Sequence, residues 1–572
     1  APVREDAARA YYWPYESREN LHVLLNTFAN RVVWAEGTGS GPATAKGVEV
    51  TLKTGAISTI GATKEVIVSA GALKTPAILE LSGIGNPDIL HKHNISVKVD
   101  LPTVGENLQD QTNSHMDASS NRTLSGGKPV SYPNIYDILG DEAETVGNKL
   151  RANLKKYAEE SAKANGNVMK AADLERLFEV QYDLIFKKNT PVAEILNYAA
   201  DKTLSTEFWS LLPFARGNVH IASANPKQFP TINPNYFMFE WDVESFAAVG
   251  QYIRRSYETK PLSTLVKEAT PGLKNVPQDA SVEQWKEWVF DGNYRSNFHP
   301  VGTAAMMPRA MGGVVDNRLK VYGTSNVRVV DASALPYQVC GHLVSTLYAV
   351  AERAAELIKA DAAAVGTSSS YDYIVIGGGT SGLTVANRLS EDPNVNVLII
   401  EAGDSVLNNP NVTTVDGYGL AFGTEIDWQY QSVNQTYAGN VPQVLRAGKA
   451  LAGTSAINGM AYTRAEDVQI DAWETIGNEG WTWKNLFPYY LKSENFTKPT
   501  KTQLELGASY NLEYNGENGP LNVAFTKLES NSLTTYLNRT FQAMGLPWSK
   551  DLNGGKMRGF NIFPATINYE EY

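Results

Sequence analysis

Residues 371–401 read YDYIVIGGGTSGLTVANRLSEDPNVNVLIIE, and this stretch decides the fold. The β-rich run Tyr371 to Ile376 ends in a row of glycines, and a stretch with helical character, Leu383 to Leu389, follows them. A second apolar run, Val395 to Ile400, ends at Glu401. The order strand, turn, helix, strand is the βαβ unit of a parallel sheet. The stretch therefore predicts an α/β protein with a Rossmann-like domain.

The glycines in this stretch have the spacing of a dinucleotide-binding turn. Gly377, Gly379 and Gly382 satisfy G-x-G-x-x-G, and Glu401 follows 19 residues after the last of them. The first glycine permits a tight turn, the second lets the backbone approach a pyrophosphate, and the third lets helix and strand pack closely. The helix N-terminus supplies unpaired N–H groups to the phosphates, and the acid can accept hydrogen bonds from ribose hydroxyls. This spacing alone fits both NAD and FAD.

Two further segments of small residues bear on the choice between these cofactors. Residues 445–459, LRAGKALAGTSAING, form a long loop with few side chains that would obstruct a flat ligand, and Thr454 and Asn458 supply polar contacts. Residues 69–85, SAGALKTPAILELSGIG, again place small residues around a strand end. For this second segment, tight packing of a helix on a sheet is the alternative interpretation. The loop at 445–459 favours a flavin ring system.

Other parts of the chain extend the sheet. Apolar and β-branched runs predict strands at Leu21–Leu25, Arg31–Trp34, Gly47–Thr51, Glu65–Ser69 and Val327–Asp331. Apolar residues at helical spacing predict a helix over Val344–Ile358. Small residues fill the stretch from 360 to 370, and this composition is typical of a flexible linker.

Composition excludes several classes of function. The 572 residues carry a formal net charge of −11, so electrostatic binding of nucleic acid is not expected. No apolar run reaches the roughly 20 residues that a membrane helix needs. The single cysteine, Cys340, cannot form an internal disulfide, and His91 and His93 lack further ligands nearby, so no metal site is expected.

The chain contains several Asn-x-Ser/Thr sequons, which favour a secreted glycoprotein whose signal peptide has been removed. They stand at Asn94, Asn121, Asn411, Asn434, Asn495 and Asn538.

Together with Asn297–Thr303, Cys340–Thr346 and Asn233–Trp241, these segments resemble the glucose–methanol–choline (GMC) family of FAD-dependent oxidoreductases, and most of all its fungal glucose dehydrogenases. The resemblance runs over nearly the whole chain. It implies a discontinuous FAD-binding domain and a substrate domain made of an antiparallel sheet with helices. The expected segments are 1–110, 298–361 and 371–475 for the FAD domain, 111–297 and 476–572 for the substrate domain, and 362–370 for the linker.

The chain departs from the family pattern in two ways. Ala452 stands where the family usually has glycine in the loop facing the flavin, and its methyl group is expected to narrow the approach of the flavin or to change access to it. In the family the glycine turn opens the protein and the two-histidine segment closes it, whereas here the turn follows that segment. The sequence therefore looks circularly permuted, with its two ends expected to be neighbours in space.

The resemblance assigns the active-site histidine pair to His299, as the base, and His342, as its partner. If the segment around His299 is extended, Arg295 and Asn297 share its face, as donors to sugar hydroxyls. Glu207 and Tyr418 are further pocket candidates. The resemblance implies that FAD is bound by Gly377, Gly379, Thr380, Ser381, Gly382, Glu401, Ala402, Trp428, Gly453, Thr454, Asn458, Gly459, Ala461, Ala29, Asp331, Ala332, Leu343 and Val344.

The expected reaction is oxidation of an aldose, β-D-glucose at C1 above all, to the lactone. A neutral imidazole takes the hydroxyl proton while hydride moves to the flavin, and a small quinone-type or artificial acceptor then takes the electrons. Three alternatives stay open. An oxidase for sugars or aryl alcohols would share every FAD motif. An NAD-dependent dehydrogenase would explain the glycine turn but not the small-residue loop, and a flavin-binding scaffold would need no histidine pair.

Overall fold

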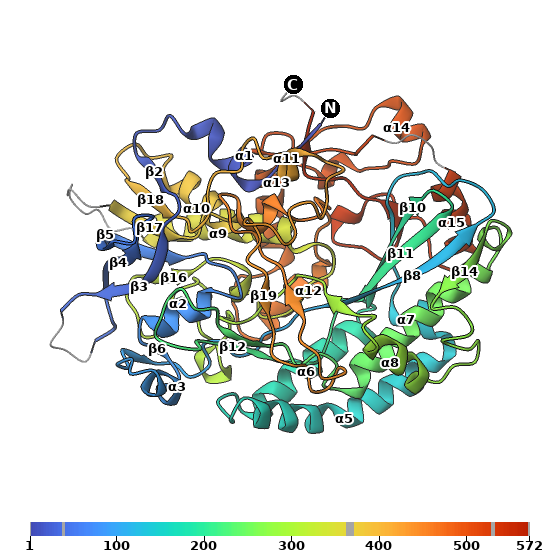
Figure 1. Ribbon diagram of the computed structural model, residues 1–572, viewed down its shortest axis with the longest axis horizontal. Coiled ribbons are helices and arrows are strands. Elements are labelled where there is room, and N and C mark those ends of the chain that lie inside the picture. The colour runs from blue at the N-terminus through green and yellow to red at the C-terminus, as the bar shows by residue number, and fades with distance from the viewer. Residues whose placement is uncertain (1, 37–40, 362–370, 528–531, 570–572) are drawn as a thin grey trace.

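The computed structural model describes residues 2–36, 41–361, 371–527 and 532–569, in which two seven-stranded sheets lie side by side (Figure 1). In the first sheet, five strands run parallel: β2 (Leu21–Leu24), β18 (Val397–Ile400), β17 (Tyr371–Ile376), β5 (Ile57–Val68) and β16 (Val327–Val329). Strand β5 continues into an antiparallel meander with β4 (Ala45–Thr51) and β3 (Phe28–Trp34). A parallel sheet with helical crossovers is what the βαβ pattern predicts. In spatial order the strands are β2, β18, β17, β5, β4 and β3, with β16 also on β5.

The second sheet is antiparallel and lies to the right of the first in Figure 1. Its strands are β14 (Val266–Thr270), β8 (Thr112–Ser120), β11 (Thr203–Ser210), β10 (Ala193–Ala200), β9 (Pro129–Tyr132) and β23 (Gly559–Ile562), with β15 (Arg295–Ser296) paired to β8. The strands of the second sheet lie within residues 112–296 and 559–562, and those of the first sheet within residues 21–68, 327–329 and 371–400. The domain boundaries themselves stay a prediction.

Helices cover both sheets. The long helix α9 (Leu343–Asp361) packs against α10 (Thr380–Leu389), which follows β17, and α7 (Glu240–Glu258) packs on β11 and β8. The remaining α-helices are α1 (Ala7–Tyr11), α2 (Thr75–Leu81), α3 (Pro87–Lys92), α4 (Ile135–Leu139), α5 (Ala143–Ala164), α6 (Ala171–Phe186), α8 (Val282–Phe290), α11 (Pro410–Thr413), α12 (Asp467–Thr475), α13 (Trp483–Ser493), α14 (Lys501–Glu505) and α15 (Ser532–Ala543).

Within the described part of the chain, five two-stranded ladders accompany the two sheets. The pair nearest the chain ends sets Val3 opposite Asn568, so the described residues near the two ends are neighbours, as the permuted order requires. The permutation itself stays a prediction, and the expected linker lies outside the described residues. The ladders are β1 (Val3–Arg4) with β24 (Ile567–Asn568), β6 (Ile84–Gly85) with β7 (Val99–Asp100), β12 (Asn218–His220) with β13 (Thr231–Asn233), β19 (Tyr430–Gln431) with β20 (Val444–Leu445), and β21 (Glu494–Phe496) with β22 (Leu521–Val523).

Two titratable groups stand out beyond the hydrophobic core. His220 lies between two carboxylates, with Nδ1 2.7 Å from Glu80 Oε1 and Nε2 3.0 Å from Glu106 Oε1. Burial disfavours the charged imidazole, but the two carboxylates outweigh it and raise the pKa of His220 to about 10. The other group is Cys340, which is 1% exposed, and burial raises the pKa of its thiol.

None of the helices in the described ranges is long and apolar enough to cross a membrane. Within the same ranges, no three His, Cys, Asp or Glu side chains gather in a way that could hold a metal ion.

Candidate active site

A cavity of about 340 Å³ lies between the two sheets. Its wall includes the residues that directly follow the carboxyl ends of the parallel strands: Ser69 after β5, Gly377 after β17 and Glu401 after β18. Asp331, two residues beyond β16, also lines it. Ligands of open α/β sheets bind at this edge of the sheet. The cavity is therefore placed where the glycine turn predicts a dinucleotide.

The structure brings the predicted site residues together. All of them except Gly382 line this one cavity, although they come from segments spread over the chain. The antiparallel sheet contributes Glu207 on β11 and Arg295 on β15, and the loop after β15 contributes Asn297 and His299.

The glycine turn has the geometry that its spacing predicts. Gly377 has a φ of +105°, which L-residues rarely adopt, and a Cβ at Gly382 would lie 2.0 Å from the Gly377 carbonyl oxygen. Gly382 therefore packs α10 on β17 and has no place in the cavity wall. A Cβ at Gly379 would meet only the Cα of Gly453, at 3.6 Å, so the second glycine leaves room on its cavity side.

The small-residue loop at 445–459 rests directly on this turn. The Ala452 N–H donates to the Gly378 carbonyl oxygen at 2.8 Å. Ala452 itself is fully buried and does not line the cavity, so the expectation that its methyl narrows the approach of a flavin is wrong. Its φ of +106° gives the physical reason for a glycine at this position, because the backbone conformation disfavours a side chain.

Glu401 ties the glycine turn to the end of β18. Its carboxyl oxygens accept hydrogen bonds from the Gly378 N–H at 2.8 Å and from the Gly403 N–H at 2.7 Å. Burial raises the pKa of Glu401 to about 7, against the effect of these backbone donors. Each carboxyl oxygen keeps lone-pair capacity for a further donor, such as a ribose hydroxyl.

His299 and His342 face one another on the cavity wall. Their ring centroids are 5.6 Å apart and the rings are nearly perpendicular, at 88°. One hydroxyl oxygen between two such rings can contact both of them. His299, in the loop after β15, and His342, directly before α9, are thus a pair in space.

The surroundings of His299 keep its ring uncharged. Burial, reinforced by the nearby His342 and Arg295, lowers its pKa to about 3. The loop that carries it is held by Asp110, which accepts a hydrogen bond from the His299 N–H at 3.0 Å. Phe298, with a φ of +61°, turns the chain just before the histidine. Because Phe298 and Pro300 also line the cavity, the predicted alternation ends with the two residues of β15.

His342 has a carboxylate partner that the sequence did not reveal. Its Nε2 lies 2.9 Å from Oε1 of Glu194, which is fully buried on β10. A carboxylate accepts hydrogen bonds and cannot donate them, so Nε2 of His342 carries a proton. The two histidines therefore have different environments, because the ring of His299 contacts side-chain amides and that of His342 contacts a buried carboxylate.

Polar groups near the histidines suit a hydroxyl-rich ligand. Arg295 Nη2 lies 3.0 Å from Glu207 Oε2, and both side chains are partly exposed to the cavity. Asn113 donates from Nδ2 to Asn297 Oδ1 at 3.0 Å. The Tyr418 side chain lies at the same end of the cavity, where its ring meets Phe422 edge-on at 5.3 Å between centroids.

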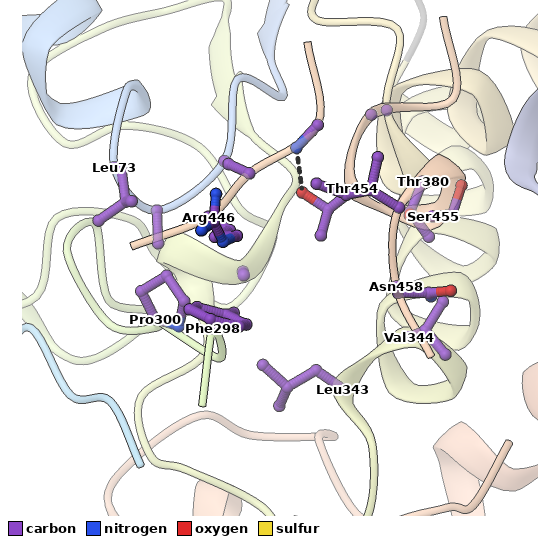
Figure 2. Close-up of a pocket in the computed structure, with 18 of the residues that line it drawn as sticks. Leu73, Phe298, Pro300, Leu343, Val344, Thr380, Arg446, Thr454, Ser455 and Asn458 are labelled. Atoms are coloured by element: carbon purple, nitrogen blue, oxygen red, sulfur yellow. Dashed lines mark hydrogen bonds between the residues drawn. The ribbon is translucent and has the colours of Figure 1, made fainter. Parts of the chain in front are cut away.

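Several wall residues were missed by sequence reasoning because nothing local marks them. Lys74 lines the cavity, and burial lowers its pKa to about 8 while its Nζ donates to the Pro226 carbonyl oxygen at 2.7 Å. Figure 2 shows the two facing walls, with Leu73, Arg446, Phe298 and Pro300 on one side and Thr380, Thr454, Ser455, Asn458 and Val344 on the other.

The residues present fit an FAD molecule. A helix N-terminus and an open glycine turn meet the needs of a pyrophosphate. Glu401 suits ribose hydroxyls, and Thr454 Oγ1, which accepts from the Gly448 N–H at 3.2 Å, anchors the loop expected beside a ring system (Figure 2). Trp428 and Tyr430 stack with centroids 5.8 Å apart and offer aromatic surface at the cavity wall.

Two family models, both described as GMC oxidoreductase, match the chain. The one for the amino-terminal part of such proteins matches residues 2–113 and 371–569, and the one for the carboxy-terminal part matches residues 213–351.

Named relatives agree with this match. The chain is 44% identical to the glucose oxidase-like protein fsoC of Humicola fuscoatra, over 62% of this chain and 60% of that protein. It is 36% identical to a glucose oxidase of Penicillium chrysogenum, over 63% and 59% of the two chains. The chain thus spans about 60% of the length of these curated relatives. A solved fungal aryl-alcohol oxidase is 27% identical, with a TM-score of 0.52 over 58% of this chain and 60% of that one.

Proposed function

The chain belongs to the GMC oxidoreductase family, and from this premise we propose that it is an FAD-dependent enzyme that oxidises an aldose at C1. β-D-Glucose is the proposed substrate, the lactone is the product, and a quinone-type or artificial compound is the electron acceptor. The family sets aside the NAD-dependent alternative, since the cofactor of GMC oxidoreductases is FAD.

The residues that line the cavity indicate how this chain would bind the cofactor. The α10 N-terminus with Gly377 and Gly379 would hold the pyrophosphate, Glu401 the ribose, and the loop from Thr454 to Asn458 the ring system. When bound, FAD supplies the two-electron acceptor for the substrate's hydride.

The observation that carries the proposal is the histidine pair on this wall. His299 is uncharged in neutral solution, so its ring can accept the proton of a substrate hydroxyl. His342 lies 5.6 Å away, centroid to centroid, and Glu194 keeps its Nε2 protonated and its ring oriented. One imidazole is thereby ready to take a proton, while the contact with Glu194 holds the other ring in place across the cavity wall.

Sugar specificity is proposed to come from Arg295, Glu207 and Asn297, with Tyr418 at the same end of the cavity. A site that hydrogen-bonds several hydroxyls rejects analogues without them, because its buried polar groups would be left unpaired. The Arg295–Glu207 pair offers both donors and acceptors for such hydroxyls.

The test is anaerobic mixing of the yellow protein with a panel of sugars and alcohols while the flavin band is followed. Glucose should bleach it, and His299→Ala should slow bleaching about 10²–10⁴-fold with FAD still bound. Arg295→Ala should raise KM for glucose and leave kcat largely intact. If the flavin of His299→Ala is bleached at the wild-type rate, His299 is not the base. If Arg295→Ala keeps the wild-type preference for glucose over an aryl alcohol, Arg295 does not determine sugar specificity.

A second candidate is an oxidase that passes electrons to O₂. The named relatives include glucose oxidases, and the fold resembles an aryl-alcohol oxidase. The aromatic contacts of Phe422 with Phe298 and Tyr418 at the cavity are compatible with aryl alcohols. Oxygen consumption during turnover separates the two candidates.

Secretion is a further proposal, supported by the sequons. Asn94, Asn121 and Asn434 are exposed, so their side chains are accessible to glycosylation. A shift in apparent mass after endoglycosidase treatment of the protein from its natural source would test this.

A further inference from the structure

Gln111 lies directly behind the His299 ring, outside the cavity wall. Its side chain is fully buried, and its Oε1 is 2.8 Å from His299 Nδ1. The Asn297 N–H donates to the Gln111 carbonyl oxygen at 2.8 Å, which continues the antiparallel pairing of β15 with β8. Strand pairing therefore holds Gln111 beside the segment that carries the histidine.

The orientation of the Gln111 amide follows from its other neighbour. Its Nε2 lies 3.3 Å from the carbonyl oxygen of Leu211, which can only accept a hydrogen bond. The amide nitrogen must therefore face Leu211, and the amide oxygen must face His299. A reversed amide would set two acceptors against each other in a buried site, at a cost.

Asn297 is the second group near His299 Nδ1. Its Nδ2 lies 3.1 Å from that nitrogen and 3.4 Å from Gln111 Oε1, while its Oδ1 accepts from Asn113 Nδ2 at 3.0 Å. Nδ1 thus has an acceptor at 2.8 Å and a donor at the longer distance. The shorter contact favours a proton on Nδ1, with Asn297 donating to the shared Gln111 oxygen.

We propose that Gln111 is a positioning residue that sets the tautomer of His299, with Nδ1–H donating to Gln111 Oε1 and the lone pair of Nε2 left free on the other side of the ring. The inference rests on the proposed function, in which that lone pair takes the substrate proton. The opposite tautomer would present an N–H to the hydroxyl and could not act as a base.

The test removes the acceptor and reads the tautomer directly. In Gln111→Leu, Asn297 Nδ2 becomes the nearest partner of Nδ1, so the proton should move to Nε2. Long-range ¹⁵N–¹H NMR of holoenzyme labelled at its seven histidines reports the tautomer, with the His299 signal assigned by its loss in His299→Asn. Wild type should show Nδ1–H. Gln111→Leu should show Nε2–H, and glucose should bleach its flavin at least about 10²-fold more slowly than in wild type. Gln111→Glu keeps an oxygen at this place and should restore Nδ1–H, although its second carboxylate oxygen faces the Leu211 carbonyl oxygen and should lower stability.

Gln181→Leu is the matched control. Gln181 is also buried, and its Nε2 donates to the carbonyl oxygens of Leu212 at 2.9 Å and Pro213 at 3.0 Å. Its loss should lower stability and leave the His299 tautomer unchanged. Nε2–H in the wild type, or Nδ1–H in Gln111→Leu, would overturn the inference, and the wild-type signal suffices if the Leu variant does not fold. If the tautomers behave as expected but His299→Ala bleaches normally, the proposed base fails and the role of Gln111 stands.

Discussion

Replacing the third glycine of the turn should damage the fold, whereas replacing the second should damage only cofactor binding. A Cβ at Gly382 would lie 2.0 Å from the Gly377 carbonyl oxygen, while real Cβ atoms essentially never come closer than 3.0 Å to such an atom. In Gly382→Ala, α10 must therefore move about 1 Å away from β17. Overpacking of this kind costs about 1–3 kcal/mol. At about 1.4 kcal/mol per factor of ten, the unfolding equilibrium shifts about 5- to 140-fold.

Gly379→Ala is the contrast. Its Cβ would meet only Gly453 Cα, at 3.6 Å, and its φ is −90°, so the cofactor-free protein should keep its stability. The added methyl stands at the cavity wall, and FAD binding should weaken about tenfold or more, which is about 1.4 kcal/mol. Urea unfolding of both cofactor-free variants and titration with FAD measure the two quantities. Equal unfolding midpoints for Gly382→Ala and wild type would refute the packing argument, and unchanged FAD affinity in Gly379→Ala would refute the placement of the pyrophosphate.

Three further predictions concern stability and chain order. His220→Gln should cost about 3–5 kcal/mol, because it removes the positive charge that lies between two buried carboxylates. Because the folded-state pKa of His220 is raised, the stability that it contributes is complete below about pH 6.5 and declines as pH rises through about 10, so urea midpoints of variant and wild type should converge in alkali. Ala452→Gly should stabilise by about 0.5–1 kcal/mol in calorimetry, since it relieves a φ of +106°. Joining the ends beyond Val3 and Asn568, and opening the chain between residues 361 and 371, should give a folded, FAD-binding protein; loss of both properties would contradict the permuted order.

The sequence predicted what local patterns determine. The strand, turn and helix from Tyr371 onward occur where expected, because β-branched residues, glycines and helical apolar spacing all act over a few residues. The helix predicted from Val344 to Ile358 extends from Leu343 to Asp361, a small error at its ends. These elements then fix where a cofactor can lie.

Partners across the fold could not be predicted in this way. Glu194 meets His342, and Gln111 meets His299, through pairing of distant strands, and no local signal marks either contact. Ala452 is the reverse case. The family pattern drew attention to the right position, but the family's preference for glycine there is explained by the backbone angle φ and not by the space that a flavin ring needs. Only the folded chain distinguishes a side chain that faces the cavity from one that faces away.

The single thiol gives the protein a built-in reporter. Cys340 stands two residues before His342, is 1% exposed, and lies with its sulfur 3.3 Å from the Pro191 carbonyl oxygen. A thiol reagent can reach it only when the segments packed around it separate, so the labelling rate of the native protein measures how often this region next to His342 opens. Any cysteine introduced at the surface will react far faster than Cys340. Dyes or spin labels can therefore be attached at chosen positions without first removing the native residue.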